Sequence, residues 1–383
     1  MLPLIALGAL LASLHVQAAS YPRVESFSGQ SFFDGFTYPA ETYDNTTNGD
    51  VFWATASNTS LIYINDDNHI ILKVDNTSSV PYNSKRYAPK LLAKSAYDIG
   101  TVWVLDAVHM PYGCGVWPGF WTQGSDWPNG GEIDISEGVN KRTNNMIALH
   151  TGNGSTCTVT GGSSMSGSVT FDNCDNSLNG GSGCTINDTD SKSYGEGFGA
   201  AGGGVYIAEW AKDGIRVWFK TRSDVPSSLT VSADSIDTSS LGTPVAEYSS
   251  DSCDIETLFG SQTLTIDITL CGDFAGTPSE LALTCPALSG DATCYSTYVI
   301  DDQSANFAAA YYEINYINVF SSSGSGGQSG GKVTGTVTAT AGVGTGTGSS
   351  GENTSSRAEE RWAAAGGLMG LAGLLLAFGA AVF

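Results

Sequence analysis

The chain has 383 residues, which is enough for one large domain or two of ordinary size. Its 38 acidic residues against 16 Lys and Arg give a formal charge of −22, so nucleic acid and anionic lipid surfaces would repel it. A neutral partner fits this charge, although acidity also serves simply to keep a surface soluble.

The first segment, residues 1–19, carries an apolar run that is too short to span a bilayer. It closes with Val16-Gln17-Ala18, a small-residue pattern typical of signal-peptidase sites. The segment therefore predicts a secretory signal, although its start lacks Lys and Arg. A buried helix is the alternative.

From residue 20 to residue 320 the chain predicts one all-β domain. Short runs of alternating apolar and polar residues recur between turns rich in Gly, Asn, Asp and Ser, and no helical period persists. Many short strands in a chain of this length favour a two-sheet sandwich. The runs are Leu61–Ile64, Ile70–Val74, Val102–His109, Val205–Trp210, Ile215–Lys220, Leu264–Leu270 and Tyr311–Phe320.

Two of these runs, Val205–Trp210 and Ile215–Lys220, are separated by a short turn and predict a hairpin. On the second strand, alternate residues from Ile215 to Phe219 should point into the core. Trp218 falls on the opposite face, where it is either exposed or covered by a loop.

Eight cysteines and six glycosylation sequons fit an oxidising, extracellular compartment. The even number of cysteines allows up to four disulfides, whose pairing the sequence does not give. The cysteines are Cys114, Cys157, Cys174, Cys184, Cys253, Cys271, Cys285 and Cys294, and the sequons begin at Asn45, Asn58, Asn76, Asn153, Asn187 and Asn353.

The stretch Gly130–Gly138, GGEIDISEG, carries three carboxylates with irregular spacing. On a regular strand Glu132 and Asp134 share a face, and Glu137 would point the opposite way. A β-bulge near Ile135-Ser136 would return Glu137 to the face of the other two, and bulges are over-represented beside active sites.

Three carboxylates on one face repel one another, so we expect a use for them. A structural Ca²⁺ site is one alternative, although nothing here matches a calcium-loop pattern, and three solvated acids are another. The favoured use is glycoside cleavage, in which a retaining enzyme needs two carboxyls about 5–5.5 Å apart. Leaning Glu132 and Glu137 side chains could approach this separation, while Asp134 would orient one of them and help to raise its pKa.

Aromatic residues crowd the sequence before these acids, including Trp117, Trp121 and Trp127. Flat rings stack on the apolar faces of sugars, so we expect Trp121 and Trp127 to line a cleft. Proline and glycine between them argue against a long strand there. His150 lies on the next predicted strand and could face the carboxylates.

Other chemistries find little support in the motifs. The sequence has four histidines and no HExxH, which argues against a zinc hydrolase, and it has no GxSxG of a serine hydrolase. No metal ligand set and no required cofactor are predicted.

The last part of the chain predicts a stalk and an anchor. Residues 321–356 are rich in Gly, Ser and Thr and lack core-forming residues, as in a flexible stalk. Residues 357–383 contain the uncharged apolar tail Ala363–Phe383, preceded by a polar spacer and small residues. This order predicts a removed glycosylphosphatidylinositol (GPI) signal with the lipid attached at Ser350, Gly351 or Asn353, and a transmembrane anchor is the alternative.

The motif Gly131–Gly138, with Trp127-Pro128 before it and Leu149-His150-Thr151 after it, closely resembles glycoside hydrolase family 16, specifically the laminarinase-like fungal endo-1,3(4)-β-glucanases. The bulged ExDxxE form is specific, and the resemblance extends over most of residues 20–320. It implies a β-jelly-roll with a concave substrate cleft, as in concanavalin A-like folds, and a double-displacement retaining mechanism.

Carried over by position, the resemblance makes Glu132 the nucleophile, Glu137 the general acid/base and Asp134 the supporting acid. Trp127 and His150 would contact sugar. Two positions depart from the family pattern: Phe274 stands where relatives usually have Trp, which would weaken one sugar subsite, and Tyr312 also replaces a common Trp.

The expected function is hydrolysis of internal bonds in β-1,3 or mixed β-1,3/1,4 glucans by a monomer held at the cell surface or in the cell wall by its lipid. A wall transglycosylase is the alternative within the enzyme class, although its fungal relatives typically carry the unbulged motif. A non-catalytic glucan-binding wall protein is the alternative outside it.

Overall fold

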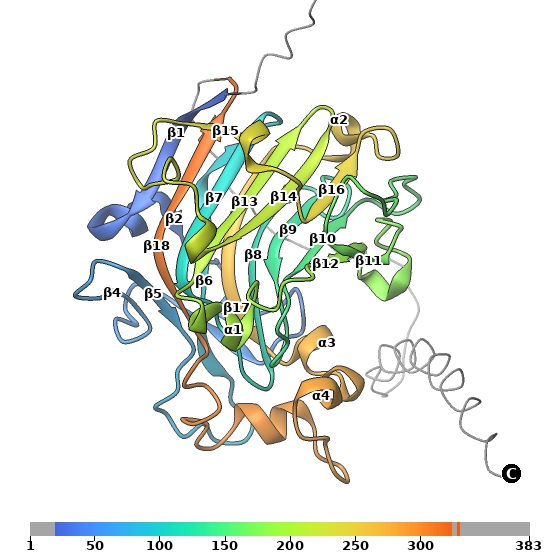
Figure 1. The fold of residues 1–383 in the computed structure, drawn as a ribbon. Helices are drawn as coiled ribbons and strands as arrows, with labels where there is room; N and C mark the ends of the chain where they lie inside the picture. The colour runs from blue at the N-terminus through green and yellow to red at the C-terminus, as the bar shows by residue number, and fades with distance from the viewer. Residues whose placement is uncertain (1–19, 324–327, 330–383) are drawn as a thin grey trace, which may run out of the picture.

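The computed structural model describes residues 20–323 and 328–329, and these fold into two antiparallel sheets packed face to face (Figure 1). The prediction of an all-β two-sheet sandwich is confirmed. One strand pair, β3 with β6, is parallel.

The first sheet contains nine strands within the described residues. Its central strand order is β15 (Ser235–Asp237), β1 (Ser20–Ser28), β18 (Tyr311–Ser321), β7 (Thr101–His109), β13 (Gly204–Ala211), β14 (Gly214–Thr221) and β16 (Ala246–Ser249). In addition, β5 (Ile70–Lys73) pairs with β18, and β4 (Ile62–Ile64) pairs with β5.

The second sheet contains ten strands within the described residues and carries the acidic motif. Its order is β11 (Ser168–Phe171), β12 (Cys184–Asn187), β10 (Met146–His150), β9 (Glu132–Glu137), β8 (Val116–Gly124), β17 (Gln262–Leu270), β6 (Arg86–Tyr97) and β19 (Gln328–Ser329), with β2 (Phe36–Thr37) and β3 (Val51–Ala54) beside β6.

Helices are short and lie in the connections between strands (Figure 1). The α-helices are α1 (Gly195–Ala200), α2 (Ile255–Leu258), α3 (Gly272–Ala275) and α4 (Pro278–Thr284). The remaining turns are η1 (Gly29–Gly35), η2 (Asn179–Gly181), η3 (Arg222–Asp224), η4 (Thr238–Leu241) and the π-helical turn η5 (Tyr295–Val299).

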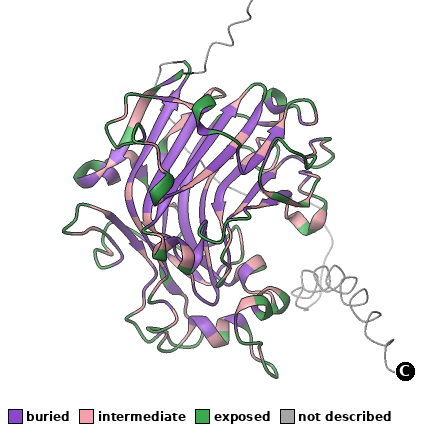
Figure 2. Cartoon of the chain, viewed as in Figure 1, coloured by how far each residue is buried: buried purple, intermediate pink, exposed green. Residues whose placement is uncertain are grey.

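All seven predicted runs form strands with boundaries within two residues of those expected. In β7, β13 and β17 nearly every residue is buried, so both faces of these strands are covered (Figure 2). The expectation that Pro and Gly would prevent a long strand after residue 116 is wrong. Strand β8 runs through Pro118 and Gly119. It pairs with β9 only from Gly119 onward, so the N–H that Pro118 lacks falls outside that ladder.

The predicted hairpin of β13 and β14 is present, with Ala211 paired to Gly214. Trp218 lies on the outer face of β14 but is only 3% exposed. It belongs to a second apolar cluster that includes Leu229 and Leu241, and its indole N–H donates to the Gly242 carbonyl. The segment that contains Leu229 and Leu241 therefore covers this tryptophan, in agreement with the alternative that a loop buries it.

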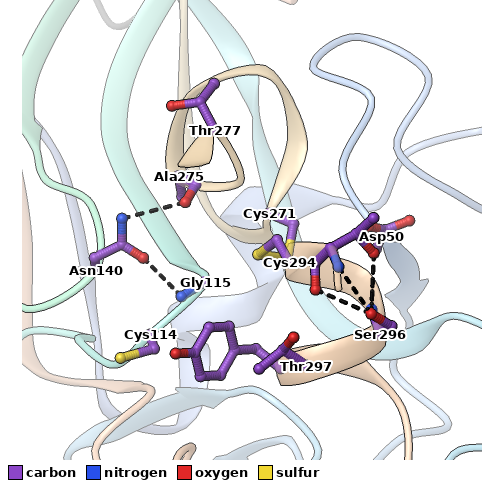
Figure 3. The surroundings of a disulfide bond; sticks show 12 residues. Asp50, Cys114, Gly115, Asn140, Cys271, Ala275, Thr277, Cys294, Ser296 and Thr297 are labelled. Carbon is purple, nitrogen blue, oxygen red and sulfur yellow. Dashed lines mark hydrogen bonds between the residues drawn. A yellow bond between two sulfur atoms is a disulfide. The ribbon is translucent and has the colours of Figure 1, made fainter. Parts of the chain in front are cut away.

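All eight cysteines are paired: Cys114–Cys285, Cys157–Cys253, Cys174–Cys184 and Cys271–Cys294. Two of these bonds bracket the segment that holds α3 and α4, and Figure 3 shows the Cys271–Cys294 bond at its start. The sequence allowed up to four disulfides, and all four form.

The predicted signal at residues 1–19 and the predicted tail at residues 357–383 lie outside the described residues, as does most of the predicted stalk. At the start of that stalk, Ser321 ends β18 and Gln328–Ser329 pair with β6. Over the part of the chain that the structure covers, no helix has both the length and the apolar character needed to cross a bilayer.

Candidate active site

Strand β9 carries the predicted bulge. Glu137 pairs with Gly119 of β8 and with Met146 of β10, whereas Asp134 pairs with Trp121 and Ala148. Three residue steps on β9 therefore cover the length of two steps on each neighbour. The extra residue brings Glu137 onto the same face as Glu132 and Asp134, while Ile133 and Ile135 enter the core.

The side chain of Asn145 satisfies the backbone of this bulge. Its Oδ1 accepts from the Glu137 backbone N–H at 3.1 Å, and its Nδ2 donates to the Ile135 carbonyl at 3.1 Å. Asn145 is buried, so these two backbone groups would otherwise lose hydrogen bonds away from water. Sequence reasoning missed this residue because no local pattern marks it.

His150 lies on β10, directly opposite Glu132. Its Nε2 is 3.3 Å from Asp134 Oδ2 and 3.9 Å from Glu132 Oε1. Its Nδ1 is 3.2 Å from the Asn176 side-chain oxygen. The expectation that His150 faces the carboxylates is confirmed in its geometry, and both ring nitrogens have an acceptor beside them.

Each glutamate receives a hydrogen bond from an indole. The Trp127 N–H donates to Glu132 Oε2, and the Trp117 N–H donates to Glu137 Oε1 at 2.7 Å. Trp127 is 48% exposed, so its ring forms part of the rim of the site. The sequence placed Trp117 in the aromatic cluster but assigned it no role.

Burial raises the pKa of both glutamates. The pKa of Glu137 reaches about 7, and the charge of Asp134 adds to the rise at Glu132. Burial also raises the pKa of Asp134. Because both glutamates shift in the same direction, the shifts alone do not separate a nucleophile from an acid.

Burial alone would lower the pKa of His150, but the carboxylates around it raise that pKa to about 10. The raised pKa favours the cationic imidazolium, which has an acceptor oxygen beside each ring nitrogen. Its charge offsets part of the repulsion among the acids.

The other predicted sugar-contacting residues lie near this group. Trp121 pairs with Asp134, its indole donates to Asp267 at 3.1 Å, and the Lys90 ammonium lies 5.2 Å from its ring centre. Phe274, in α3, packs edge-on against Trp117 with ring centres 5.5 Å apart. Tyr312 is fully buried in the core, so its departure from the family pattern affects packing.

Glu132, Asp134 and His150 place one potential metal-ligating atom each within 4.8 Å of one another. One of the three is an imidazole, and Ca²⁺ takes six to eight oxygen ligands. These three donors do not match the coordination of the calcium alternative.

The raised pKa of Glu137 makes a prediction about stability. At pH 4 its carboxyl is protonated in both the folded and the unfolded chain. The pKa of this carboxyl is 4.5 in the unfolded chain and about 7 in the folded chain. Between these two pH values the unfolded chain releases the proton first, so native stability falls as pH rises. Glu137→Gln, which does not titrate, should therefore gain stability over wild type at pH 8 relative to pH 4, by about 1–3 kcal/mol.

Urea unfolding at both pH values measures this difference, with Glu41→Gln at an exposed position as the control. A Glu137→Gln effect of equal size at pH 4 and pH 8 would contradict the assignment of a raised pKa.

Comparison with known proteins adds to this geometry. A family model described as "XgeA-like, catalytic GH16 domain" matches residues 36–320. A probable glycosidase of Schizosaccharomyces pombe is 36% identical over 312 residues, which cover 79% of this chain and 70% of that protein. A probable endo-1,3(4)-β-glucanase of Neosartorya fischeri is 37% identical over 82% of this chain, but the match spans only 49% of that relative.

Two solved structures share the fold. Laminarinase 16A of Phanerochaete chrysosporium, with β-glucans in its donor and acceptor sites, is 34% identical with a TM-score of 0.72 and covers 79% of this chain and 99% of its own. An elongating β-1,3-glucosyltransferase is 36% identical with a TM-score of 0.71 over 79% of this chain and 100% of its own. The jelly-roll prediction is confirmed, and the chain belongs to glycoside hydrolase family 16, with an XgeA-like catalytic domain.

Proposed function

We propose that the protein is a retaining endo-β-glucanase that hydrolyses internal bonds of β-1,3 or mixed β-1,3/1,4 glucans. The observation that carries this proposal is the bulged strand β9, which presents Glu132, Asp134 and Glu137 on one face of the sheet. The relatives named endo-1,3(4)-β-glucanase support the substrate class.

In the first step, Glu132 attacks the anomeric carbon while Glu137 gives its proton to the glycosidic oxygen, so that the leaving sugar departs as an alcohol. In the second step, Glu137 takes a proton from water, which attacks the same carbon and releases Glu132. Asp134 and the His150 cation lie beside Glu132, where they can orient it and balance its charge.

Aromatic surface near the acids supports a neutral sugar as substrate. Trp127 is exposed at the rim, and Trp121 and Phe274 are each half-buried. Their rings can cover the apolar faces of pyranoses, and the acidic surface does not oppose an uncharged polymer.

A glucan transglycosylase is the second candidate, because a glucosyltransferase of the same family is among the similar solved structures. It would form the same covalent intermediate and pass it to a sugar hydroxyl in place of water. A non-catalytic glucan-binding wall protein is a third candidate, which would leave the acid cluster without a use.

Reducing-end release from laminarin, lichenan and cellulose tests these candidates. We expect release from the first two, and losses of at least about a thousandfold in Glu132→Gln and Glu137→Gln, because each removes a group that acts in the transition state. Added laminari-oligosaccharides should leave the yield of reducing ends largely unchanged.

Elongated products with little net release would identify a transglycosylase. Glucan binding without hydrolysis or transglycosylation would favour the non-catalytic glucan-binding protein.

The location of the protein is part of the same proposal. Four disulfides suit an oxidising compartment, and residues 1–19 and 357–383 have the composition of a secretory signal and a GPI signal. The protein would then be a monomer held on the cell surface or in the wall.

A phosphatidylinositol-specific phospholipase C should release the protein from membranes of the expressing cell. Retention after this treatment, with release only by detergent, would favour a transmembrane anchor.

A further inference from the structure

The Glu137 side chain accepts a hydrogen bond from an indole. Trp117 lies on β8, and its N–H donates to Glu137 Oε1 at 2.7 Å. This hydrogen bond favours the ionised carboxylate and opposes the rise in the pKa of Glu137 that burial causes. Whatever fixes the Trp117 ring therefore acts on Glu137.

The Trp117 ring packs against a chain of contacting residues that begins at Phe274. Phe274 meets it edge-on, with ring planes at 85° and centres 5.5 Å apart. The Arg142 guanidinium lies 5.8 Å from the centre of the Phe274 ring. Arg142 is held in turn by Glu280, in the first turn of α4, through an Nε–H bond of 2.8 Å.

The segment that carries Phe274 and Glu280, residues 271–285, is itself tied down at both ends. Disulfides join Cys271 to Cys294 and Cys285 to Cys114. Figure 3 shows Asn140 between this segment and Gly115, the residue before β8: its Nδ2 donates to the Ala275 carbonyl at 3.2 Å, and its Oδ1 accepts from the Gly115 N–H at 2.7 Å.

The backbone of Cys271 has a φ of 59°, in the left-handed region that favours glycine. Such a conformation is unfavourable and persists only where the surroundings determine it. The fold thus fixes the start of α3, and with it the place of Phe274. We call residues 271–285 the α3–α4 wall.

We propose that the α3–α4 wall is a positioning element for the general acid/base: Phe274, held beneath the Arg142–Glu280 ion pair, fixes the indole of Trp117, which orients Glu137. The catalytic role of Glu137 rests on the proposed function, whereas the hydrogen bond and its supports do not. In catalysis, a fixed Trp117 would keep Glu137 aimed through both steps, first as an acid and then as a base.

Several other groups bear on the ionisation of Glu137. They are Glu132 and Asp134 on β9, His150 on β10, Asp267 on β17, and the buried phenols of Tyr194 and Tyr312. None of them belongs to the wall. Phe274→Leu changes no charge among them, whereas Arg142→Met also removes a positive charge that lowers the pKa of the Tyr194 phenol.

The competing explanation is that Phe274 contacts sugar directly, as the family resemblance implies. A lost sugar contact would weaken substrate binding and leave the protonation of Glu137 unchanged. A lost positioning contact would move that protonation even without substrate.

The indole N–H resonance of Trp117, followed by ¹⁵N-edited NMR of the full chain during a pH titration, separates the two explanations. The variants are Phe274→Leu, which removes the ring, Phe274→Trp, which keeps one, and Arg142→Met, which removes the ion pair. Lys212→Met breaks the exposed pair with Glu256 and serves as the control. Trp117→Phe assigns the resonance.

The chemical shift of the Trp117 N–H should change with pH as Glu137 titrates, and the inflection of this curve gives the titration midpoint of Glu137. We expect this midpoint to rise by about half to one pH unit in Phe274→Leu and by less in Arg142→Met. It should not change in Phe274→Trp or Lys212→Met. The alkaline limb of kcat/KM should move with it, and Phe274→Leu should add no further shift to Trp117→Phe. The Arg142→Met arm keeps the test open if Phe274→Leu fails to fold.

An unchanged inflection in both Phe274→Leu and Arg142→Met would overturn the proposal, even if KM rises, and would leave Phe274 as a sugar contact. An equal shift in Lys212→Met would overturn it too. If the wild-type protein acts on no glucan but Phe274→Leu and Arg142→Met still shift the Glu137 titration as expected, the proposed function fails and the positioning role stands.

Discussion

One extra residue in β9 between Asp134 and Glu137 is the constraint on which the site depends. Without it, Glu137 would point into the core and Ser136 would face the cleft. A bulge leaves backbone groups without their ladder partners, and the buried side chain of Asn145 supplies both a donor and an acceptor to them. The third carboxylate is therefore aimed by a side chain from the loop before β10.

Gathering three acids on a buried face costs stability, because burial and mutual repulsion both disfavour their charges. The structure offsets part of this cost with the His150 cation and with one indole N–H on each glutamate. These same contacts hold the carboxyls in fixed places before any substrate arrives. An arrangement that is costly for folding and ordered for chemistry is what an active site requires.

Much of this was open to prediction from sequence, since period-two alternation marks strands such as β7 and β13, and the spacing of Glu132, Asp134 and Glu137 implies the bulge. Sequence patterns did not predict the features that depend on contacts between residues far apart in the chain. Strand β8 contains Pro118 and was not expected to be long, the disulfide pairing depends on the fold, and Asn145 acquires its role only when β10 packs against β9. The anchors of Phe274 were hidden for the same reason, because Arg142 and Glu280 lie 138 residues apart in sequence.

The stereochemistry of the first product tests the central claim most directly. If the bulge places Glu132 and Glu137 on one face at the short separation of about 5–5.5 Å that a covalent intermediate needs, both steps invert and the net outcome is retention. Proton NMR of reducing ends released from laminarin in the first minutes, before mutarotation, should then show the β-anomer. An initial α-anomer would mean direct attack by water between carboxyls about 6.5–9.5 Å apart, and would contradict the account.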